Sequence, residues 1–368
     1  MIGMRLPYKF IRTFSGKVAL VMAGLFIATV TLAYSITVAH KIPTSPIQTH
    51  SSETRGYWTE RIEEIGAERA YAEFANSMTD IAPIKQHTAS HEFGAALYTV
   101  FGFEGIKTCD NRFLWGCFHE VMGETLAAHG LSVITDLQKI CDGFSELQAD
   151  ACRHSIGHGL LAWFGYSDKN LEQALEACSS YITGSANNTL GGCYSGVFME
   201  FTLRTMGAPE GQNYKVDSPT QYYSICYGLS AEFRTTCAAQ AIQSWILSTH
   251  EFSREAFFKF GELCRGFNSP LFVDYCYTGL GNHLPTDKSL SASEVIARCK
   301  AAAPSERGSL LCRSSSAAIS LALNGQPSVD ICDDLTGWAQ EYCNEYATGS
   351  ADYRLMVDDL HLHEHSGQ

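Results

Sequence analysis

Fourteen cysteines, arranged as seven consecutive close pairs, constrain this 368-residue chain more than any other feature. The two cysteines of a pair lie 8 to 15 residues apart, and each pair follows the previous one after a few tens of residues. A regular period of this size is typical of helical-repeat arrays. The pairs are Cys109 with Cys117, Cys141 with Cys152, Cys178 with Cys193, Cys226 with Cys237, Cys264 with Cys276, Cys299 with Cys312, and Cys332 with Cys343.

Each cysteine pair marks the same local pattern. An amphipathic segment such as LEQALEAC ends on the first cysteine, and a second segment such as CRHSIGHGLLAWFG begins on the second. Two helices joined in this way bring their cysteines close enough to bridge. We therefore predict an all-α, antiparallel helix-pair repeat array with local disulfides. Its spacing resembles tetratricopeptide and Sel1-type solenoids, although the diagnostic tetratricopeptide residues are missing.

The cysteine usage also indicates a compartment. An even cysteine count favours a disulfide framework, which forms in oxidising, exported environments. The sequence contains no C-x-x-C motif, which argues against zinc ribbons, thioredoxin-like redox chemistry and covalently attached c-type haem.

The N-terminal segment predicts a membrane anchor. Residues 18–38 carry no charge and are numerous enough for a helix to cross a bilayer, and basic residues 5, 9, 12 and 17 precede them. A signal peptide cleaved near Ala39 is the alternative. We expect a cytoplasmic basic segment (1–17), a transmembrane anchor (18–38), a linker (39–56), a periplasmic or extracellular helical-repeat domain (57–350) and a polar, histidine-containing tail (351–368), of which the end, HLHEHSGQ, is expected to be disordered.

The charge balance limits the partners. The chain has 26 Lys and Arg against 39 Asp and Glu, and five of the basic residues precede residue 51. An exported part this acidic repels nucleic acid. We therefore expect the membrane, through the N-terminal helix, and another exported protein as partners, and no nucleic acid.

The histidines follow the cysteine register. Counting each helix from its second cysteine, His119 and His154 both occupy position +2, and His158 occupies +6. The segment HTASHEFGAALYTVFG aligns with HSIGHGLLAWFG, which places His87 at +2 and His91 at +6 of a unit that has Lys85 in place of the cysteine. The pairs His87/His91 and His154/His158 have the i, i+4 spacing that puts both rings on one face of a helix.

These five histidines are the candidate metal ligands, lining a groove beside the helix contacts and converging on one or two ions. Imidazole ligands suit divalent zinc, copper or iron, and haem held without covalent attachment is a less favoured reading. If the site is catalytic, Glu120 or Glu124 is the candidate base, and Glu200 is a candidate partner of a ligand.

Two alternatives to this histidine site remain, a di-iron hydroxylase site and an interaction scaffold without metal. The dipeptides His91-Glu92, His119-Glu120 and His250-Glu251 are loosely similar to those of di-iron hydroxylases built on HEAT repeats, although they fall in different registers here. The second alternative is a disulfide-stapled interaction scaffold in which the histidines and the neighbouring Gly157 and Gly159 only pack between helices.

Overall fold

The computed structural model describes residues 52–366, apart from residues 80, 82, 111, 145, 183–191, 204–205, 207–218, 250–251 and 288. Throughout this part of the chain the regular structure is helical, with no β-strand, which confirms the predicted all-α class. The α-helices are α2 (Ser52–Ile65), α3 (Ala67–Ser77), α4 (Pro83–Phe101), α5 (Gly116–His129), α6 (Ile134–Cys141), α7 (Glu146–Phe164), α8 (Asp168–Tyr181), α9 (Cys193–Leu203), α10 (Pro219–Gly228), α11 (Ala231–Thr249), α12 (Arg254–Arg265), α13 (Pro270–His283), α14 (Ala292–Ala302), α15 (Glu306–Asn324), α16 (Trp338–Thr348) and α17 (Met356–Ser366).

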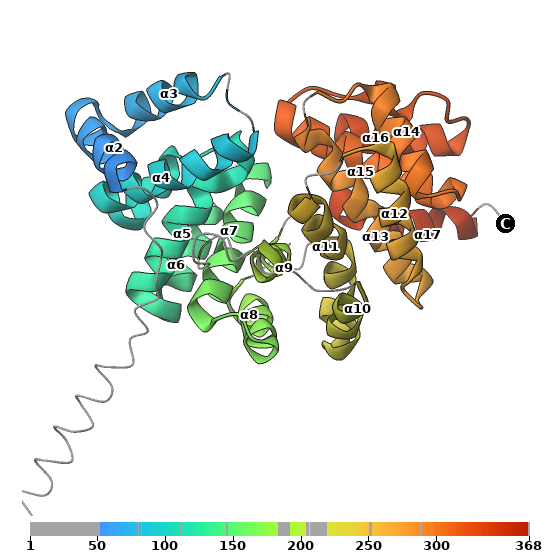
Figure 1. The fold of residues 1–368 in the computed structure, drawn as a ribbon, viewed down its shortest axis with the longest axis horizontal. Coiled ribbons are helices and arrows are strands. Elements are labelled where there is room, and N and C mark those ends of the chain that lie inside the picture. The colour runs from blue at the N-terminus through green and yellow to red at the C-terminus, as the bar shows by residue number, and fades with distance from the viewer. Residues whose placement is uncertain are drawn as a thin grey trace, which may run out of the picture. The chain divides into compact units, whose positions relative to one another are not determined.

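One series of helices packs in chain order. Helix α4 contacts α5, α5 contacts α7, α7 contacts α9, and the series continues through α11 and α13 to α15. Shorter helices fill the sides of this series: α8 packs on α7 and α9, and α14 packs on α12 and α15. Figure 1 shows α4, α5, α7 and α9 following one another in this way.

The disulfides confirm all seven predicted pairs, with Cα–Cα separations of 5.5 to 5.9 Å. Each bridge closes a short loop between neighbouring helices or helical turns. The bridges join Cys109 to Cys117, Cys141 to Cys152, Cys178 to Cys193, Cys226 to Cys237, Cys264 to Cys276, Cys299 to Cys312, and Cys332 to Cys343.

The prediction that the second cysteine of each pair opens a helix is wrong for most units. It is confirmed for Cys193, which begins α9, and it misses the start of α5 by one residue at Cys117. The other second cysteines lie inside their helices: Cys152 in α7, Cys237 in α11, Cys276 in α13, Cys312 in α15 and Cys343 in α16.

Capping residues and a proline upstream of these cysteines start the helices earlier in the sequence. The Ser305 side chain accepts a hydrogen bond from the Gly308 amide and caps α15 before Cys312. Pro270 occupies the first turn of α13 before Cys276, where its fixed φ suits a helix start. In α13 and α15 the helix therefore begins before the cysteine, which bridges from the second turn.

Apolar residues at positions +4, +5, +8 and +9 from the second cysteine form a stripe that is buried between successive helices. Gly157 on α7 and Gly196 on α9 allow the closest approach: a Cβ at Gly157 would collide with the Cys193 carbonyl, and one at Gly196 with the His154 carbonyl. Backbone contact of this kind holds α7 and α9 close together beside position +2 of each helix, His154 and Ser195. The stripe residues Val121, Met122, Leu126, Ile156, Leu160, Leu161, Val197, Phe198, Phe201, Ile242 and Trp245 are all buried.

The predictions for the N-terminal and C-terminal segments have different outcomes. The predicted anchor, residues 18–38, lies outside the described residues. Within the described ranges, no helix has the length and apolar character needed to cross a membrane. Helix α2 begins at Ser52, inside the predicted linker. In the predicted polar tail, α17 buries Met356, Val357 and Leu360 and contacts α13 and α15.

Candidate metal centre

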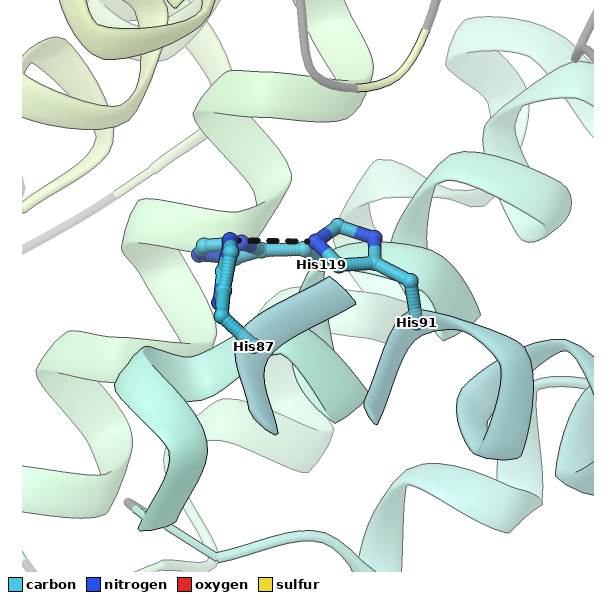
Figure 2. A group of neighbouring side chains, drawn as sticks. All are labelled: His87, His91 and His119. Carbon is cyan, nitrogen blue, oxygen red and sulfur yellow. Dashed lines mark hydrogen bonds between the residues drawn. The ribbon is translucent and has the colours of Figure 1, made fainter. Parts of the chain in front are cut away.

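The five predicted histidines come together in one cluster. His87 and His91 project from α4, His119 from α5, and His154 and His158 from α7. Figure 2 shows His87, His91 and His119 gathered with their rings side by side. His91, His119, His154 and His158 are each at most 3 % exposed, so the predicted groove is wrong and the cluster is interior. His87, of intermediate exposure, forms its outer edge.

Each i, i+4 pair brings two Nε2 atoms face to face. The Nε2 atoms of His87 and His91 are 3.2 Å apart, the contact drawn as a dashed line in Figure 2. Those of His154 and His158 are 3.0 Å apart. Two nitrogens bound about 2.0–2.1 Å from one ion lie about 2.9 Å apart at a right angle and about 3.4 Å apart at the tetrahedral angle. Both pairs therefore have the separation of two ligands of one metal ion.

The opposite ring nitrogen of each paired histidine is held by a partner. The Nδ1 of His87 lies 2.9 Å from the Phe113 carbonyl oxygen, and that of His91 lies 3.0 Å from Glu120 Oε2. The Nδ1 of His158 lies 2.9 Å from Glu200 Oε2. Carbonyl and carboxylate oxygens only accept hydrogen bonds, so these three Nδ1 atoms carry the proton and donate it.

Because the Nδ1 atoms carry the protons, the unprotonated Nε2 atoms of His87 and His91 face each other. With both Nδ1 atoms protonated, the neutral rings direct Nε2 lone pairs at one another over 3.2 Å. Two lone pairs at that distance repel unless a proton or a metal ion lies between them. In metal sites the same arrangement is the rule: the histidine binds through one nitrogen and donates its other N–H to a carbonyl or carboxylate.

The partner of His87 belongs to a strained turn. Phe113, Leu114 and Trp115 have φ of 57°, 52° and 64°, a left-handed conformation that costs L-residues about 1–2 kcal/mol each. The Cys109–Cys117 disulfide closes the loop that contains them. Strain retained in this way is typical of functional sites, and here it presents the Phe113 carbonyl to His87 and the Trp115 ring to His154, at a centroid distance of 5.2 Å.

The electrostatics keep the cluster neutral. Burial, reinforced by the neighbouring His91, lowers the pKa of His87 from 6.5 to about 3. Burial, followed by the surrounding imidazoles, lowers the pKa of His119 well below 6.5, and the pKa values of His154 and His158 fall for the same reasons. Neutral imidazole is the form that binds a metal ion.

His119 differs from the other four. Both of its ring nitrogens are buried and make no hydrogen bond. Its ring lies between the two pairs, with centroids 5.4 and 5.5 Å from His87 and His91 and 5.5 and 4.2 Å from His154 and His158. Leaving a buried polar atom without a partner costs about 1–3 kcal/mol, so the pocket around His119 favours a species that the ring can bind.

The carboxylates near the cluster have distinct contacts. Glu120 contacts His91 directly, as described above. Glu124 is ion-paired with Arg55 at 2.8 Å. Glu200, which is fully buried, also accepts from the Tyr166 hydroxyl at 2.6 Å and the Met206 amide at 2.9 Å. Glu120 and Glu200 therefore orient histidines, and the role of Glu120 or Glu124 as a base stays a prediction.

The sequence reading missed two contributors to the site. Ser195 Oγ lies 2.7 Å from His154 Nδ1. The register could have identified it, because Ser195 occupies position +2 of its helix, the position that His119 and His154 occupy in theirs. The Phe113 carbonyl had no such signal, since a main-chain group depends on the backbone conformation alone.

Among the side chains that the structure describes, two further histidines lie apart from the cluster. His283 is buried at the end of α13, and burial lowers its pKa to about 3. His361 lies near Asp274, with 3.8 Å between Nε2 and Oδ2. The dipeptide at residues 250 and 251 lies outside the described residues. The metal-ligand interpretation therefore rests on the five clustered rings.

The cluster divides into two groups of three that share a member. The ligand atoms of His87, His91 and His119 lie within 4.8 Å of one another, and so do those of His119, His154 and His158. Rings whose centroids are about 5 Å apart leave no slot for a porphyrin between them, so the geometry favours single ions over haem. No family model matches this chain, and comparison with curated proteins and solved structures finds no match either.

Proposed function

We propose that this protein binds a divalent transition metal through His87, His91, His119, His154 and His158. The observation that carries the proposal is the His87–His91 pair, whose Nε2 lone pairs face each other at 3.2 Å while both Nδ1 protons are committed elsewhere. Zinc, copper or iron fits an all-imidazole ligand set.

A reaction at this site would use an open coordination position. An ion bound by one group of three histidines, either His87, His91 and His119 or His119, His154 and His158, keeps a fourth coordination position for water or substrate, as in catalytic zinc sites. A cavity of about 270 Å³ has Gln86, Phe113 and Leu114 in its lining, but none of the five histidines lines it. Gln86 is the chain neighbour of His87, and the Phe113 carbonyl accepts from its ring, so the link between this cavity and the outermost ligand runs through these two residues.

We also propose a setting for the site: an exported helix-pair repeat array, similar to tetratricopeptide and Sel1-type solenoids, tethered by residues 18–38. The chain-order packing of α4 through α15 supports the array. The seven disulfides support an oxidising compartment. Chain isolated from intact cells under alkylation should label no cysteine before reduction and should remain with the membranes in high salt. Labelled cysteines would contradict export.

Metal content of the full chain tests the proposal. The tag-free protein, purified in detergent, stripped with a chelator and dialysed against zinc, copper or iron, is expected to retain at least one ion per chain by elemental analysis. Replacing His154 and His158 together by alanine removes two of the five ligands, so we expect the content to fall by about half or more. Chelation should also lower the thermal midpoint of the wild type, because a ligand present at about 100 times its Kd stabilises by about 2.7 kcal/mol.

The matched control is His283→Ala. His283 is buried like the cluster histidines and lies on a helix of the same series, and its pKa is lowered by burial alone, without the neighbouring imidazoles that act in the cluster. Its replacement should leave the metal content unchanged. Circular dichroism of each variant, with disulfides intact, separates lost ligands from lost folding. If the wild type retains no stoichiometric metal and chelation leaves its midpoint unchanged, the histidines are packing residues of an interaction scaffold.

A further inference from the structure

The division of the cluster into two overlapping groups has a chemical consequence. One metal ion accepts ligand atoms that all lie around a single point. The five rings instead form two groups of three, whose ligand atoms lie within 4.8 Å of one another, and His119 belongs to both groups. Each of the two pairs already has the nitrogen separation of two ligands of its own ion.

His119 is the one ring of the five with two nitrogens available. In His87, His91, His154 and His158 the Nδ1 atom contacts a carbonyl, carboxylate or hydroxyl oxygen, which leaves Nε2 alone for a metal. In His119 both nitrogens are buried and unpartnered. They point to different sides of the ring, so a single ion cannot use both of them.

We propose that the cluster is a dinuclear metal centre in which His119 bridges the two ions through its two ring nitrogens. This inference rests on the proposed metal function. Each ion then has three nitrogen ligands, two from a pair and one from His119, and retains an open position. The bridging ring loses its remaining N–H proton to solvent when the second ion binds, so one proton is released for the bridge. Metal–nitrogen bonds of about 2.0–2.1 Å place the ions about 6 Å apart across the ring.

The environment of His119 fits this role. Its ring lies between the two pairs, and Figure 2 shows it beside the His87–His91 pair. The two groups also differ in access, because His87 is partly exposed whereas His154 and His158 are at most 1 % exposed. The outer ion therefore faces solvent, and the inner ion is enclosed by α5, α7 and α9.

Copper loading tests the bridge without relying on activity. The full chain, stripped and titrated with Cu²⁺, is expected to bind two ions. Because an imidazolate bridge couples the two copper spins antiferromagnetically, the low-temperature electron paramagnetic resonance signal should account for less than half of the bound copper. Replacing one copper by diamagnetic zinc in the same wild-type protein should restore a signal equal to the remaining copper.

The copper content and the signal intensity separate three claims: the bridge, the dinuclear centre and metal binding itself. Two coppers with full signal intensity would overturn the bridge, and one ion per chain would overturn the dinuclear centre while leaving the metal function intact. Binding of no metal would overturn the proposed function itself. The variant His119→Gln should abolish the coupling and lower the affinity for the second ion, whereas His283→Gln should leave both unchanged. The mixed copper–zinc sample keeps the test valid if His119→Gln does not fold.

Discussion

Metal-free protein is expected to lose stability steeply as the pH falls below about 6.5. The pKa values of His87, His119, His154 and His158 are lowered by folding, whereas in the unfolded chain they return to about 6.5. Below that pH the unfolded state binds more protons than the folded state, so acid favours unfolding. The stabilisation is complete above pH 6.5 and is lost progressively toward the folded-state pKa, which is about 3 for His87.

The size of the stability loss in acid follows from the number of buried histidines that stay neutral in the folded protein. Each histidine that stays neutral while its unfolded form protonates contributes a slope of about 1.4 kcal/mol per pH unit, so four give up to about 5 kcal/mol per unit. Typical domains have about 5–15 kcal/mol in total. We therefore expect acid unfolding within about one to three units below pH 6.5, measured by denaturant titration at successive pH values with chelator present.

A pair of variants isolates the cluster in this experiment. His119→Leu should reduce the slope by about 1.4 kcal/mol per pH unit, because it removes one buried titrating ring. His129→Leu, at the exposed end of α5, is the control for replacing a histidine outside the cluster. Metal-loaded protein should unfold at lower pH than metal-free protein, since the ion competes with protons for the same nitrogens. A flat stability profile between about pH 6.5 and 5 would contradict the buried, neutral cluster.

The sequence was sufficient to identify the five histidines because the cysteines provide a register. Counting from Cys117 and Cys152 aligned His119 with His154, and the resemblance of two segments added His87 and His91. Disulfide pairing was predictable for a related reason: two cysteines 8 to 15 residues apart, on consecutive helices, have few other partners within reach.

Burial of the cluster was not predictable from this register. A helical wheel places positions +2 and +6 beside the helix contact, and ordinary packing separates neighbouring helix axes by about 8–10 Å. The rings of His119 and His154 are nevertheless 5.5 Å apart. Gly94, against the Cys117 carbonyl, and Gly159, against the Leu126 side chain, let α4, α5 and α7 approach, and the turn at Phe113 adopts a left-handed conformation. Neither property follows from hydrophobic periodicity.

Removing the buried acceptor Glu200 should affect stability and metal binding separately. Its carboxylate accepts hydrogen bonds from His158 Nδ1, the Tyr166 hydroxyl and the Met206 amide, and its side chain is fully buried. Glu200→Leu leaves these three donors without their acceptor, so we expect a loss of about 3–5 kcal/mol of unfolding free energy. Glu200→Gln keeps the volume and one acceptor oxygen but removes the charge that fixes the His158 tautomer.

For Glu200→Gln we therefore expect a folded protein whose metal affinity is lower by about 10- to 100-fold, the usual cost of losing a group that orients a ligand. Competition with a chromogenic chelator measures this affinity. The control Glu124→Gln changes a partly exposed ion pair with Arg55, worth about 0–1 kcal/mol, and should leave affinity unchanged. Tyr166→Phe removes only the hydroxyl donor and should alter stability more than affinity. Unchanged affinity in Glu200→Gln would show that His158 binds metal without this carboxylate, or does not bind it at all.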